Sequence, residues 1–312
     1  MPKVSVITLT LNRADYLQKN ILSVLSQGIE DIEILVINDN STDNTALMIE
    51  SLNDKRIKLI NFSCNGIIAR ARNEGLRRST GEFIAFVDDD DLWAPDKLKK
   101  QIEYAEKNPD YDFFYCLAGR IDGEGRNLGI YCKGRIFEGD IFKTLLRENC
   151  ICLPSVLIRR KVIDFIGYFS EDALLSPCDD YDYWLRASLK FKFGCVQEVL
   201  AFYRVHNTNF SKYINVPKSR QNVLRRICDN SKTPKEFYGY IGTVIEQINW
   251  RVSFCCWTQG KKKEAREFVL AYILFCIKKV NIFGTAWGIL LLGMEFFPFV
   301  LFKGLYKFYR KM

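Results

Sequence analysis

VSVITLTL, at residues 4–11, is an almost unbroken apolar run that is rich in β-branched side chains. Such a run is typical of a parallel strand buried on both faces, because a half-exposed strand would alternate apolar and polar residues. EILVIN (33–38), IKLINF (57–62) and EFIAFV (82–87) have the same character. The run at 4–11 therefore predicts the first of several strands in one buried sheet.

Helical patterns lie between these strands, at about residues 15–26, 45–52 and 67–78. Strands that alternate with helices at this spacing imply βαβ crossovers, so we predict an α/β fold with a mostly parallel sheet flanked by helices. Ligands in such folds bind beyond the carboxyl ends of the strands. Polar residues that directly follow a predicted strand are therefore the candidates for a functional site.

The second half of the chain has a less regular pattern. The elements that we predict there are a helix over 95–108 with Pro95 as its first residue, a strand over 112–117, a hairpin turn over 121–129, a strand over 155–159, a helix over 180–189 and a strand over 194–205. From about Pro217 onward the pattern is helical. We therefore expect an α/β domain at residues 1–212 and a helical extension at 213–312.

The composition of the 312 residues fits a folded chain, because a hydrophobic content of 48% is enough to fill a core. The eleven cysteines are scattered, without CxxC pairs or a regular framework, so we interpret them as reduced core residues. The apolar run at 4–9 has no charged segment or cleavage site before it. We therefore expect the N-terminal domain to remain in the cytoplasm.

FVDDDD (86–91) takes a predicted strand directly into four adjacent carboxylates. Adjacent negative charges repel one another, and the repulsion is relieved when a divalent cation with oxygen ligands, Mg²⁺ or Mn²⁺, shares the site with phosphates. The alternative is a solvated acidic loop that interacts favourably with the dipole of the next helix. The position at the carboxyl end of a strand favours the metal-site interpretation.

Two further polar groups precede the acidic strand in the sequence. Asp39, in NDNSTDNT (38–45), directly follows a strand and can either accept a hydrogen bond from a nucleotide base or cap the next helix. Arg72 lies on the predicted helix before the acidic strand. Its guanidinium suits a diphosphate through paired hydrogen bonds, although most helical arginines are only surface charges.

A second group of acids lies far along the chain, in CDDYDYWLR (178–186). Asp180 is a candidate catalytic base, because a base must lie apart from metal-bound phosphates, whereas Asp179 and Asp182 can instead cap the helix that they open. His206, the only histidine of the chain, follows a predicted strand. It is either a structural residue or a ligand for a metal or a phosphate.

Taken in order, these segments resemble glycosyltransferase family 2, whose members are inverting enzymes with a GT-A fold. The resemblance covers about the first 210 residues, and its segments are VSVITLTLNR, EILVINDNSTDNT, NGIIARARNEGL, GEFIAFVDDDDLWAPDKLKKQ, IGYFSE, CDDYDYWLR and YRVH. The resemblance implies a GT-A fold and a metal-dependent enzyme that takes a sugar from a nucleotide-sugar donor.

The family's site residues fall on particular positions of this sequence. The resemblance implies that the donor is contacted by Thr10, Asn12, Asp39, Arg72, Asp88 and Asp89. Asp88 and Asp90 would form the DxD element, and Asp90 and His206 would bind the Mn²⁺ or Mg²⁺ ion. Asp180 would be the base that deprotonates the acceptor hydroxyl, so that one displacement inverts the anomeric carbon.

The chain departs from the family's usual pattern around the predicted nucleotide site. Leu9 and Leu11 stand where Pro and Tyr are common, while Asn38, Asn40 and Asp179 replace Asp, Gly and Glu. The loss of an aromatic platform weakens the assignment of the base as uridine and leaves the reaction class unchanged. We expect a UDP-sugar donor, and an acceptor that belongs to cell-surface polysaccharide or lipid-linked glycan synthesis.

The chain after residue 260 is both basic and apolar. It has ten Lys and Arg residues against three Glu, and IFGTAWGILLLGMEFFPFVLF (282–302) approaches the length of a membrane span. Glu295 and Pro298 disfavour a simple span, since a charge at the bilayer centre costs at least ~2.5 kcal/mol. We expect helices, including an amphipathic one over 268–277, to lie on the cytoplasmic face of a membrane. The alternative is a soluble dimer or partner surface, and nucleic acid is not expected as a partner.

Two other functional classes are compatible with a nucleotide site and acidic residues. A nucleotidyltransferase would need the cation and the acids but not Asp180, and it would release pyrophosphate rather than a nucleotide diphosphate. A catalytically silent, membrane-anchored nucleotide-binding protein is the other alternative. The presence of two separate acid groups favours an enzyme over the silent protein.

Overall fold

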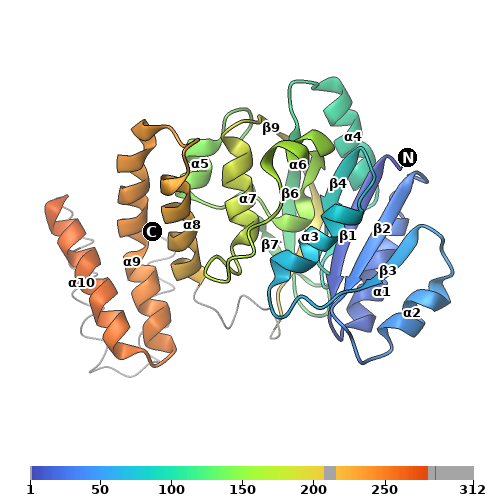
Figure 1. The fold of residues 1–312 in the computed structure, drawn as a ribbon, viewed down its shortest axis with the longest axis horizontal. Helices are drawn as coiled ribbons and strands as arrows, with labels where there is room; N and C mark the ends of the chain where they lie inside the picture. The colour runs from blue at the N-terminus through green and yellow to red at the C-terminus, as the bar shows by residue number, and fades with distance from the viewer. Residues whose placement is uncertain (1, 207–215, 280–284, 286–312) are drawn as a thin grey trace. The chain divides into compact units, whose positions relative to one another are not determined.

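The computed structural model describes residues 2–206, 216–279 and 285 (Figure 1). Contacts within the chain divide it into two compact units. The first comprises residues 1–214 with 230–233, and the second comprises 215–229 with 234–312. Each unit has a hydrophobic cluster of its own and is considered by itself.

One sheet forms the centre of the first unit. Its strands are β1 (Val4–Thr10), β2 (Ile32–Asn38), β3 (Ile57–Asn61), β4 (Phe83–Phe86), β5 (Leu92–Trp93), β6 (Phe113–Ile121), β7 (Asn127–Ile130), β8 (Leu157–Arg159) and β9 (Phe193–Arg204). They are hydrogen-bonded in the order β3, β2, β1, β4, β8, β6, β9, β5, and β7 pairs with β6. The four strands that the apolar runs predict are therefore neighbours in the sheet.

These four strands are parallel, as predicted. Val4 of β1 lies opposite Ile32 of β2 on one side and Phe83 of β4 on the other. The rest of the sheet is mixed, because β8 is antiparallel to both β4 and β6, while β6 and β9 are parallel. The predicted α/β fold with a mostly parallel sheet is confirmed, and the antiparallel position of β8 is an addition to it.

Helices cover the sheet on both faces. Those of the first unit are α1 (Ala14–Leu25), α2 (Thr45–Leu52), α3 (Ile68–Arg78), α4 (Lys97–Lys107), α5 (Phe142–Arg147), α6 (Arg160–Ile166) and α7 (Asp179–Ser188). Successive residues of β1 face opposite helices: the Thr8 hydroxyl donates to Asn20 of α1 (3.4 Å), whereas Ile7 contacts Gly75 of α3. A Cβ at position 75 would lie 2.5 Å from Ile7 Cγ2, so glycine allows α3 to approach the strand this closely.

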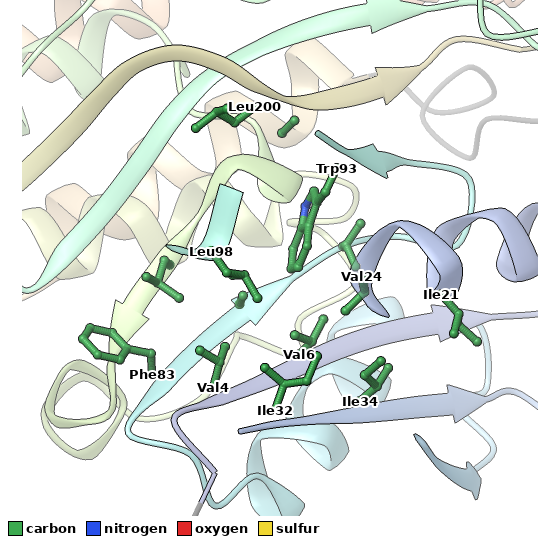
Figure 2. Close-up of a cluster of buried hydrophobic side chains, with 14 of the residues drawn as sticks. Val4, Val6, Ile21, Val24, Ile32, Ile34, Phe83, Trp93, Leu98 and Leu200 are labelled. Carbon is green, nitrogen blue, oxygen red and sulfur yellow. The ribbon is translucent and has the colours of Figure 1, made fainter. Parts of the chain in front are cut away.

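An apolar core fills the space between α1 and the sheet, as Figure 2 shows. Its side chains include Val4, Val6, Ile32, Ile34 and Phe83 from the strands and Ile21 and Val24 from α1, none more than 4% exposed. Burial of this much apolar surface, at roughly 25 cal/mol per Å², holds the strands rigidly. The loops that follow β1, β2 and β4 therefore start from fixed positions.

Most predicted elements have the predicted type and lie within two residues of their predicted bounds. β6 is longer than predicted, because it continues to Ile121 before the hairpin to β7. The prediction that Pro95 is the first residue of a helix is wrong. Asp96 has a left-handed backbone (φ 61°), and α4 begins only after it, at Lys97.

The second unit is helical in its described part, as predicted. Its helices are α8 (Val216–Asp229), α9 (Tyr238–Thr258) and α10 (Lys262–Lys278). Its hydrophobic cluster is formed by Trp250 of α9 with Val269, Tyr272, Ile273 and Cys276 of α10. The predicted amphipathic helix at 268–277 lies within α10, and the apolar segment at 282–302 lies outside the described residues. Among the helices that the structure describes, none combines the length and the apolar character needed to cross a bilayer.

Candidate active site

The four acids that follow β4, Asp88 to Asp91, form a turn that we call the acid turn. Asn20, fully buried on α1, donates from Nδ2 to the carbonyl oxygens of Asp88 (3.0 Å) and Asp91 (2.9 Å). Arg204, at the end of β9, donates from Nε to the carbonyl oxygen of Asp90 (2.7 Å) and from its backbone N–H to Asp91 Oδ1 (2.8 Å). The turn is thus fixed mainly through its peptide oxygens, and the carboxylates of Asp88, Asp89 and Asp90 have other partners.

Burial controls the protonation of the acid turn. Asp89, Asp90 and Asp91 are at most 6% exposed. Burial, with the charge of Asp90 adding to it, raises the pKa of Asp89 to about 7, and the same causes raise the pKa of Asp91 well above its usual range. Arg13 opposes the shift at Asp89. These acids therefore bind protons more readily than free carboxyl groups, and a bound cation would stabilise their charged forms, as Arg13 does at Asp89.

Two cationic or ionisable side chains contact the acid turn. Arg13, at the start of α1, places Nη1 3.1 Å from Asp89 Oδ1 and 2.9 Å from Asp90 Oδ2. His206 places Nε2 2.8 Å from the same oxygen of Asp90, and its ring stacks on Tyr16 at 5.4 Å. The structure thus brings the predicted pair of Asp90 and His206 together. Arg13 was not among the predicted site residues, although it directly follows the polar end of the first strand.

Arg72 connects the acid turn to the second group of acids. Its side chain is 7% exposed, forms an ion pair with Asp179 at the start of α7 and places Nη2 3.3 Å from Asp88 Oδ1. The neighbouring negative charges raise the pKa of Arg72 despite its burial. A buried guanidinium between two carboxylates holds α3, α7 and the acid turn in one place. Two acid groups that lie far apart in the sequence therefore belong to one site.

Asp180 lies beside this ion pair and is partly exposed. Burial of its surroundings and the charge of Asp179 raise the pKa of Asp180 to about 7, while Arg72 opposes the rise. Asp88 is close enough to contribute to the same shift. A carboxylate whose pKa lies near neutrality is suited to general base catalysis, because it is partly ionised and still basic.

Asp39 follows β2 and has two hydrogen-bond donors from one residue. Its carboxylate accepts from the backbone N–H of Cys64 (2.9 Å) and from the Cys64 thiol (2.7 Å). Its own backbone N–H donates to the carbonyl oxygen of Thr10 (2.9 Å). The alternative that Asp39 caps α2 is not supported, because Asp43 is the residue that accepts from the Thr45 N–H there. Base recognition by Asp39 stays a prediction.

Asn12 and Thr10 lie at the end of β1. The Asn12 side-chain oxygen accepts from the backbone N–H of Thr42 (2.7 Å) and of Asp43 (3.3 Å), so it ties the loop after β1 to the loop after β2. Thr10 is 4% exposed and lies close enough to Asp89 to lower its pKa. The predicted donor contacts of both residues stay predictions, and these contacts show a structural role for Asn12.

The departures from the family pattern have local explanations. The Asn38 side chain is buried and joins the strand ends, because its Nδ2 donates to Asn61 Oδ1 (2.9 Å) and its Oδ1 accepts from the Ser41 N–H (3.0 Å). Asn40 has a φ of 55°, a conformation that glycine and asparagine adopt most readily. Leu11 is 49% exposed. Asparagine therefore suits the left-handed backbone that position 40 has in this structure.

The chemistry of the acid turn fits a hard divalent cation. Asp88 and Asp90 offer carboxylate oxygens, His206 offers a ring nitrogen, and the buried charge of the turn favours a cation. In the part of the chain that the structure describes, no three His, Cys, Asp or Glu side chains converge in a metal-binding arrangement. The carboxylates instead face Arg13 and Arg72. Asp88, Asp90 and His206 are therefore of the residue types that bind such a cation, and in this structure the carboxylates pair with arginines instead.

Comparison with known families now adds to this geometry. The family model described as Glycosyl transferase family 2 matches residues 5–167, a range that includes Asp39, Arg72 and the acid turn. The chain belongs to glycosyltransferase family 2. The second acid group at α7 and His206 lie beyond the matched range, so their place in the site rests on the contacts described above.

Several curated relatives of this family 2 chain are known only as uncharacterized glycosyltransferases. One from Methanocaldococcus jannaschii, MJ1057, is 30% identical over 211 residues, which cover 66% of this chain and 72% of that protein. Another from Rickettsia bellii is 31% identical over 226 residues, 71% of this chain. The match spans only 31% of the length of the Rickettsia protein.

Solved structures share the fold of this chain at low sequence identity. S. aureus TarS 1–349 in complex with UDP-GlcNAc has a TM-score of 0.65 and 19% identity, with 91% of this chain and 89% of that chain covered. The mannosyltransferase PcManGT from Pyrobaculum calidifontis, in complex with GDP-Man and Mn²⁺, has a TM-score of 0.63 and 16% identity, with 93% and 84% covered. The predicted GT-A fold is confirmed.

Proposed function

We propose that this chain is an inverting glycosyltransferase that moves a sugar from a nucleotide-sugar donor to an acceptor hydroxyl. The observation that carries the proposal is the ion-paired bridge of Arg72 to Asp88 and Asp179. The bridge places a partly exposed carboxylate with a pKa near neutrality, Asp180, beside a strongly acidic turn. Family membership supplies the reaction class.

In the proposed reaction Asp180 removes the proton of the acceptor hydroxyl as the oxygen attacks the anomeric carbon of the donor sugar. The new C–O bond forms while the bond from that carbon to the diphosphate oxygen breaks, and the nucleotide diphosphate leaves with its electron pair. One displacement inverts the anomeric configuration. The pKa of about 7 at Asp180 suits this role, since a base must be ionised at working pH and still accept a proton.

The leaving diphosphate needs positive charge close to it. Arg72 and Arg13 are the cations that already contact the acid turn. A divalent ion, Mn²⁺ or Mg²⁺, held by Asp90 and His206 with Asp88 nearby, would supply further positive charge to the leaving group when bound. The Mn²⁺ complex of PcManGT supports this part of the proposal by analogy of fold.

The donor is proposed to be a UDP-sugar, bound by Thr10, Asn12, Asp39, Arg72, Asp88 and Asp89. TarS binds UDP-GlcNAc and PcManGT binds GDP-Man, so structures of similar fold accept both uracil and guanine nucleotides. The carboxylate of Asp39 suits both bases, because each has a ring N–H that donates to a carboxylate.

The acceptor is proposed to be a glycan or lipid-linked glycan of cell-surface polysaccharide synthesis, met at the cytoplasmic face of a membrane. Support comes from α10, where Leu270, Leu274 and Ile277 are 49%, 59% and 56% exposed. Lysines and arginines lie on the same helix. Exposed apolar side chains among basic residues suit an anionic lipid surface.

A donor screen tests the proposed reaction. The full chain is incubated with UDP-, GDP-, ADP- and CDP-sugars, with Mn²⁺, Mg²⁺ or EDTA, and the release of nucleotide diphosphate is measured together with that of pyrophosphate. We expect nucleotide diphosphate from one class of donor, and at least about 100-fold slower turnover in Asp180→Asn. Asp110→Asn, at an exposed position, is the matched control. Pyrophosphate release, or full activity of Asp180→Asn, would contradict the proposal.

A flotation experiment tests the proposed membrane contact. The full chain is mixed with vesicles of neutral lipid alone or with vesicles that also contain about 30% anionic lipid. On the anionic surface each nearby basic residue contributes about 1 kcal/mol of attraction. We expect binding to the anionic vesicles that weakens in high salt and after Leu270→Ser and Leu274→Ser. Equal recovery with both vesicle types would count against an anionic membrane surface.

A further inference from the structure

A short turn joins β3 to α3 beside the predicted base site. It consists of residues 64–67, which we call the Cys64 turn. Asn65 and Gly66 both have left-handed backbones (φ 51° and 76°), and the Ile67 N–H donates to the Cys64 carbonyl oxygen (3.0 Å). α3 begins directly after the turn and carries Arg72. The turn therefore fixes the position of Cys64 relative to a helix of the site.

Cys64 provides both hydrogen bonds that the structure shows for the Asp39 carboxylate. Its backbone N–H reaches Oδ1 at 2.9 Å and its thiol reaches Oδ2 at 2.7 Å, so each oxygen has one donor. A carboxylate has about four lone-pair directions, which leaves roughly one on each oxygen. Two donors from one residue also prevent rotation of the carboxylate about its Cβ–Cγ bond. The free lone pairs of Asp39 thus have fixed directions.

The thiol can donate a hydrogen bond in this contact only if it keeps its proton. Cys64 is 6% exposed, and burial together with the negative charge of Asp39 raises the pKa of the thiol to about 11. At neutral pH the side chain is therefore an S–H group rather than a thiolate. A neutral donor next to a carboxylate leaves the full negative charge available to a ligand.

We propose that Cys64 is a positioning residue for nucleobase recognition, which holds the Asp39 carboxylate so that it accepts the ring N–H of uracil or guanine. This inference rests on the proposed function, in which Asp39 contacts the donor base. Adenine and cytosine carry an acceptor at the corresponding ring nitrogen, so a fixed carboxylate lone pair repels them. A site that hydrogen-bonds a particular N–H rejects ligands that lack it, because its own polar group is then unpaired.

The thiol makes a contribution that the backbone N–H cannot replace. Without the S–H group, Asp39 Oδ2 loses its only donor shown in the structure, while Oδ1 keeps the Cys64 N–H. The carboxylate can then turn about the remaining bond, and Oδ2 can accept from the exocyclic amino group of adenine or cytosine. Removal of the thiol therefore weakens binding of the preferred base and reduces discrimination against the others.

Calorimetric titration of the full chain with UDP, GDP, ADP and CDP tests the inference. We expect Cys64→Ala to weaken binding of the preferred uracil or guanine nucleotide about tenfold, which corresponds to one hydrogen bond to a charged group, and to change ADP and CDP binding much less. Cys64→Ser, which keeps a donor, should bind within about threefold of the natural chain on the same grounds. If Cys64→Ala does not fold, Cys64→Val is used in its place, because valine is close in size to cysteine and has no donor.

Cys276→Ala is the control for loss of a buried thiol, since Cys276 is fully buried in α10 of the second unit. It should bind nucleotides as the natural chain does. Equal affinity in Cys64→Ala or Cys64→Val and the natural chain overturns the inference, as does a Cys64→Ser variant that binds no better than Cys64→Ala. If Asp39→Asn also binds like the natural chain, the base contact in the proposed function fails too. If Asp39→Asn alone loses binding, only the role of Cys64 is lost.

Discussion

Neighbouring acids in this site have different properties because their surroundings differ. Asp179 forms an ion pair with a buried arginine, whereas Asp180, the next residue, has a pKa raised to about 7 by burial and by the charge of Asp179. Asp39 is different again, because both of its oxygens accept hydrogen bonds. Residue type alone therefore does not assign a role, and the local partners decide it.

Turnover should depend on pH through Asp180. The base works only when ionised, so kcat should rise with pH up to about 7 and level off above it, in line with the pKa of Asp180. Asp89, whose pKa is also about 7, titrates in the same range, so the profile of Asp89→Asn is measured beside that of the natural chain. A rising limb that survives in Asp89→Asn belongs to Asp180. The range from about pH 5.5 to 8.5 spans that pKa. A kcat that stays constant across this range would show that no base with a pKa of about 7 limits the rate.

Arg72 should be hard to replace even by another cation. Its guanidinium contacts Asp179 and Asp88 together, and a lysine ammonium on a flexible stem cannot contact both in this geometry. We expect Arg72→Lys to lower kcat/KM by about 100-fold, comparable to the loss of a strong charge-assisted pair. Arg78→Lys, at the exposed end of α3, provides the comparison. Similar losses in both variants would mean that position 72 has no special role.

At the scale of elements, α3 is the helix on which the site depends most. It approaches β1 closely through Gly75, follows the Cys64 turn and carries Arg72. A small shift of this helix would move the guanidinium relative to both acid groups. The precision of the site is therefore set by how closely one helix packs on one strand.

Gly75→Ala tests this packing. The added Cβ would lie 2.5 Å from Ile7 Cγ2, in the fully packed face of β1, so either α3 or the Ile7 side chain must shift. We expect a loss of about 1–3 kcal/mol in the free energy of unfolding together with a fall in kcat/KM. Gly239→Ala is the matched control, because a Cβ there meets nothing within 4 Å. Urea unfolding that gives equal stability for Gly75→Ala and the natural chain would show that the helix is not held this closely.

At the scale of the whole molecule, the candidate site is made from two stretches of the first unit, residues 13–91 and 179–206, which the fold brings together. The loops after β1, β2 and β4 supply Arg13, Asp39 and the acid turn, while α7 and the end of β9 supply Asp180 and His206. The negative charge that accumulates there is buried at the expense of stability. Conditions that change this charge should therefore change the stability of the folded chain.

Thermal stability should fall as pH rises from about 5 to 8. The folded-state pKa of Asp89 and of Asp180, about 7, exceeds the unfolded value, so the folded chain binds protons that the unfolded chain has lost. Their contribution is thus most favourable at low pH and declines through pH 7. We expect Tm to drop by several degrees over this range, since each kcal/mol corresponds to about 2–4 °C in a unit of this size, and we expect a smaller drop in Asp89→Asn. A Tm that rises steadily would contradict the sign of the shifts.

The amino-acid pattern was sufficient to predict the parallel half of the fold, and it named Arg72, Asp90 and His206, which the structure places at the acid turn. Buried parallel strands are continuous apolar runs, so β1, β2, β3 and β4 are visible in the sequence. β5 was not predicted, and β8 was predicted as a strand without its antiparallel pairing, because strands of two and three residues owe their place to their partners. The local sequence pattern does not specify which strands pair.

The residues that sequence reasoning missed are those whose role depends on a contact. Arg13 is one of many arginines until its distance from Asp90 is known, and Cys64 is one of eleven cysteines until its thiol is seen beside Asp39. Asn20 has no signal as a support of the acid turn, since it looks like a polar residue inside an amphipathic helix. Their partners lie in other elements, and the order of residues does not specify those distances.

Asn20 and Arg204 donate hydrogen bonds to the carbonyl groups of the acid turn, and this anchoring has a consequence for catalysis. Because the main chain is anchored separately, the carboxylates of Asp88 and Asp90 could turn from their arginine partners toward a divalent ion, if one binds, without movement of the backbone. Such a change of partner would cost less than refolding a loop, because it alters side-chain torsions and leaves the backbone hydrogen bonds of the turn intact.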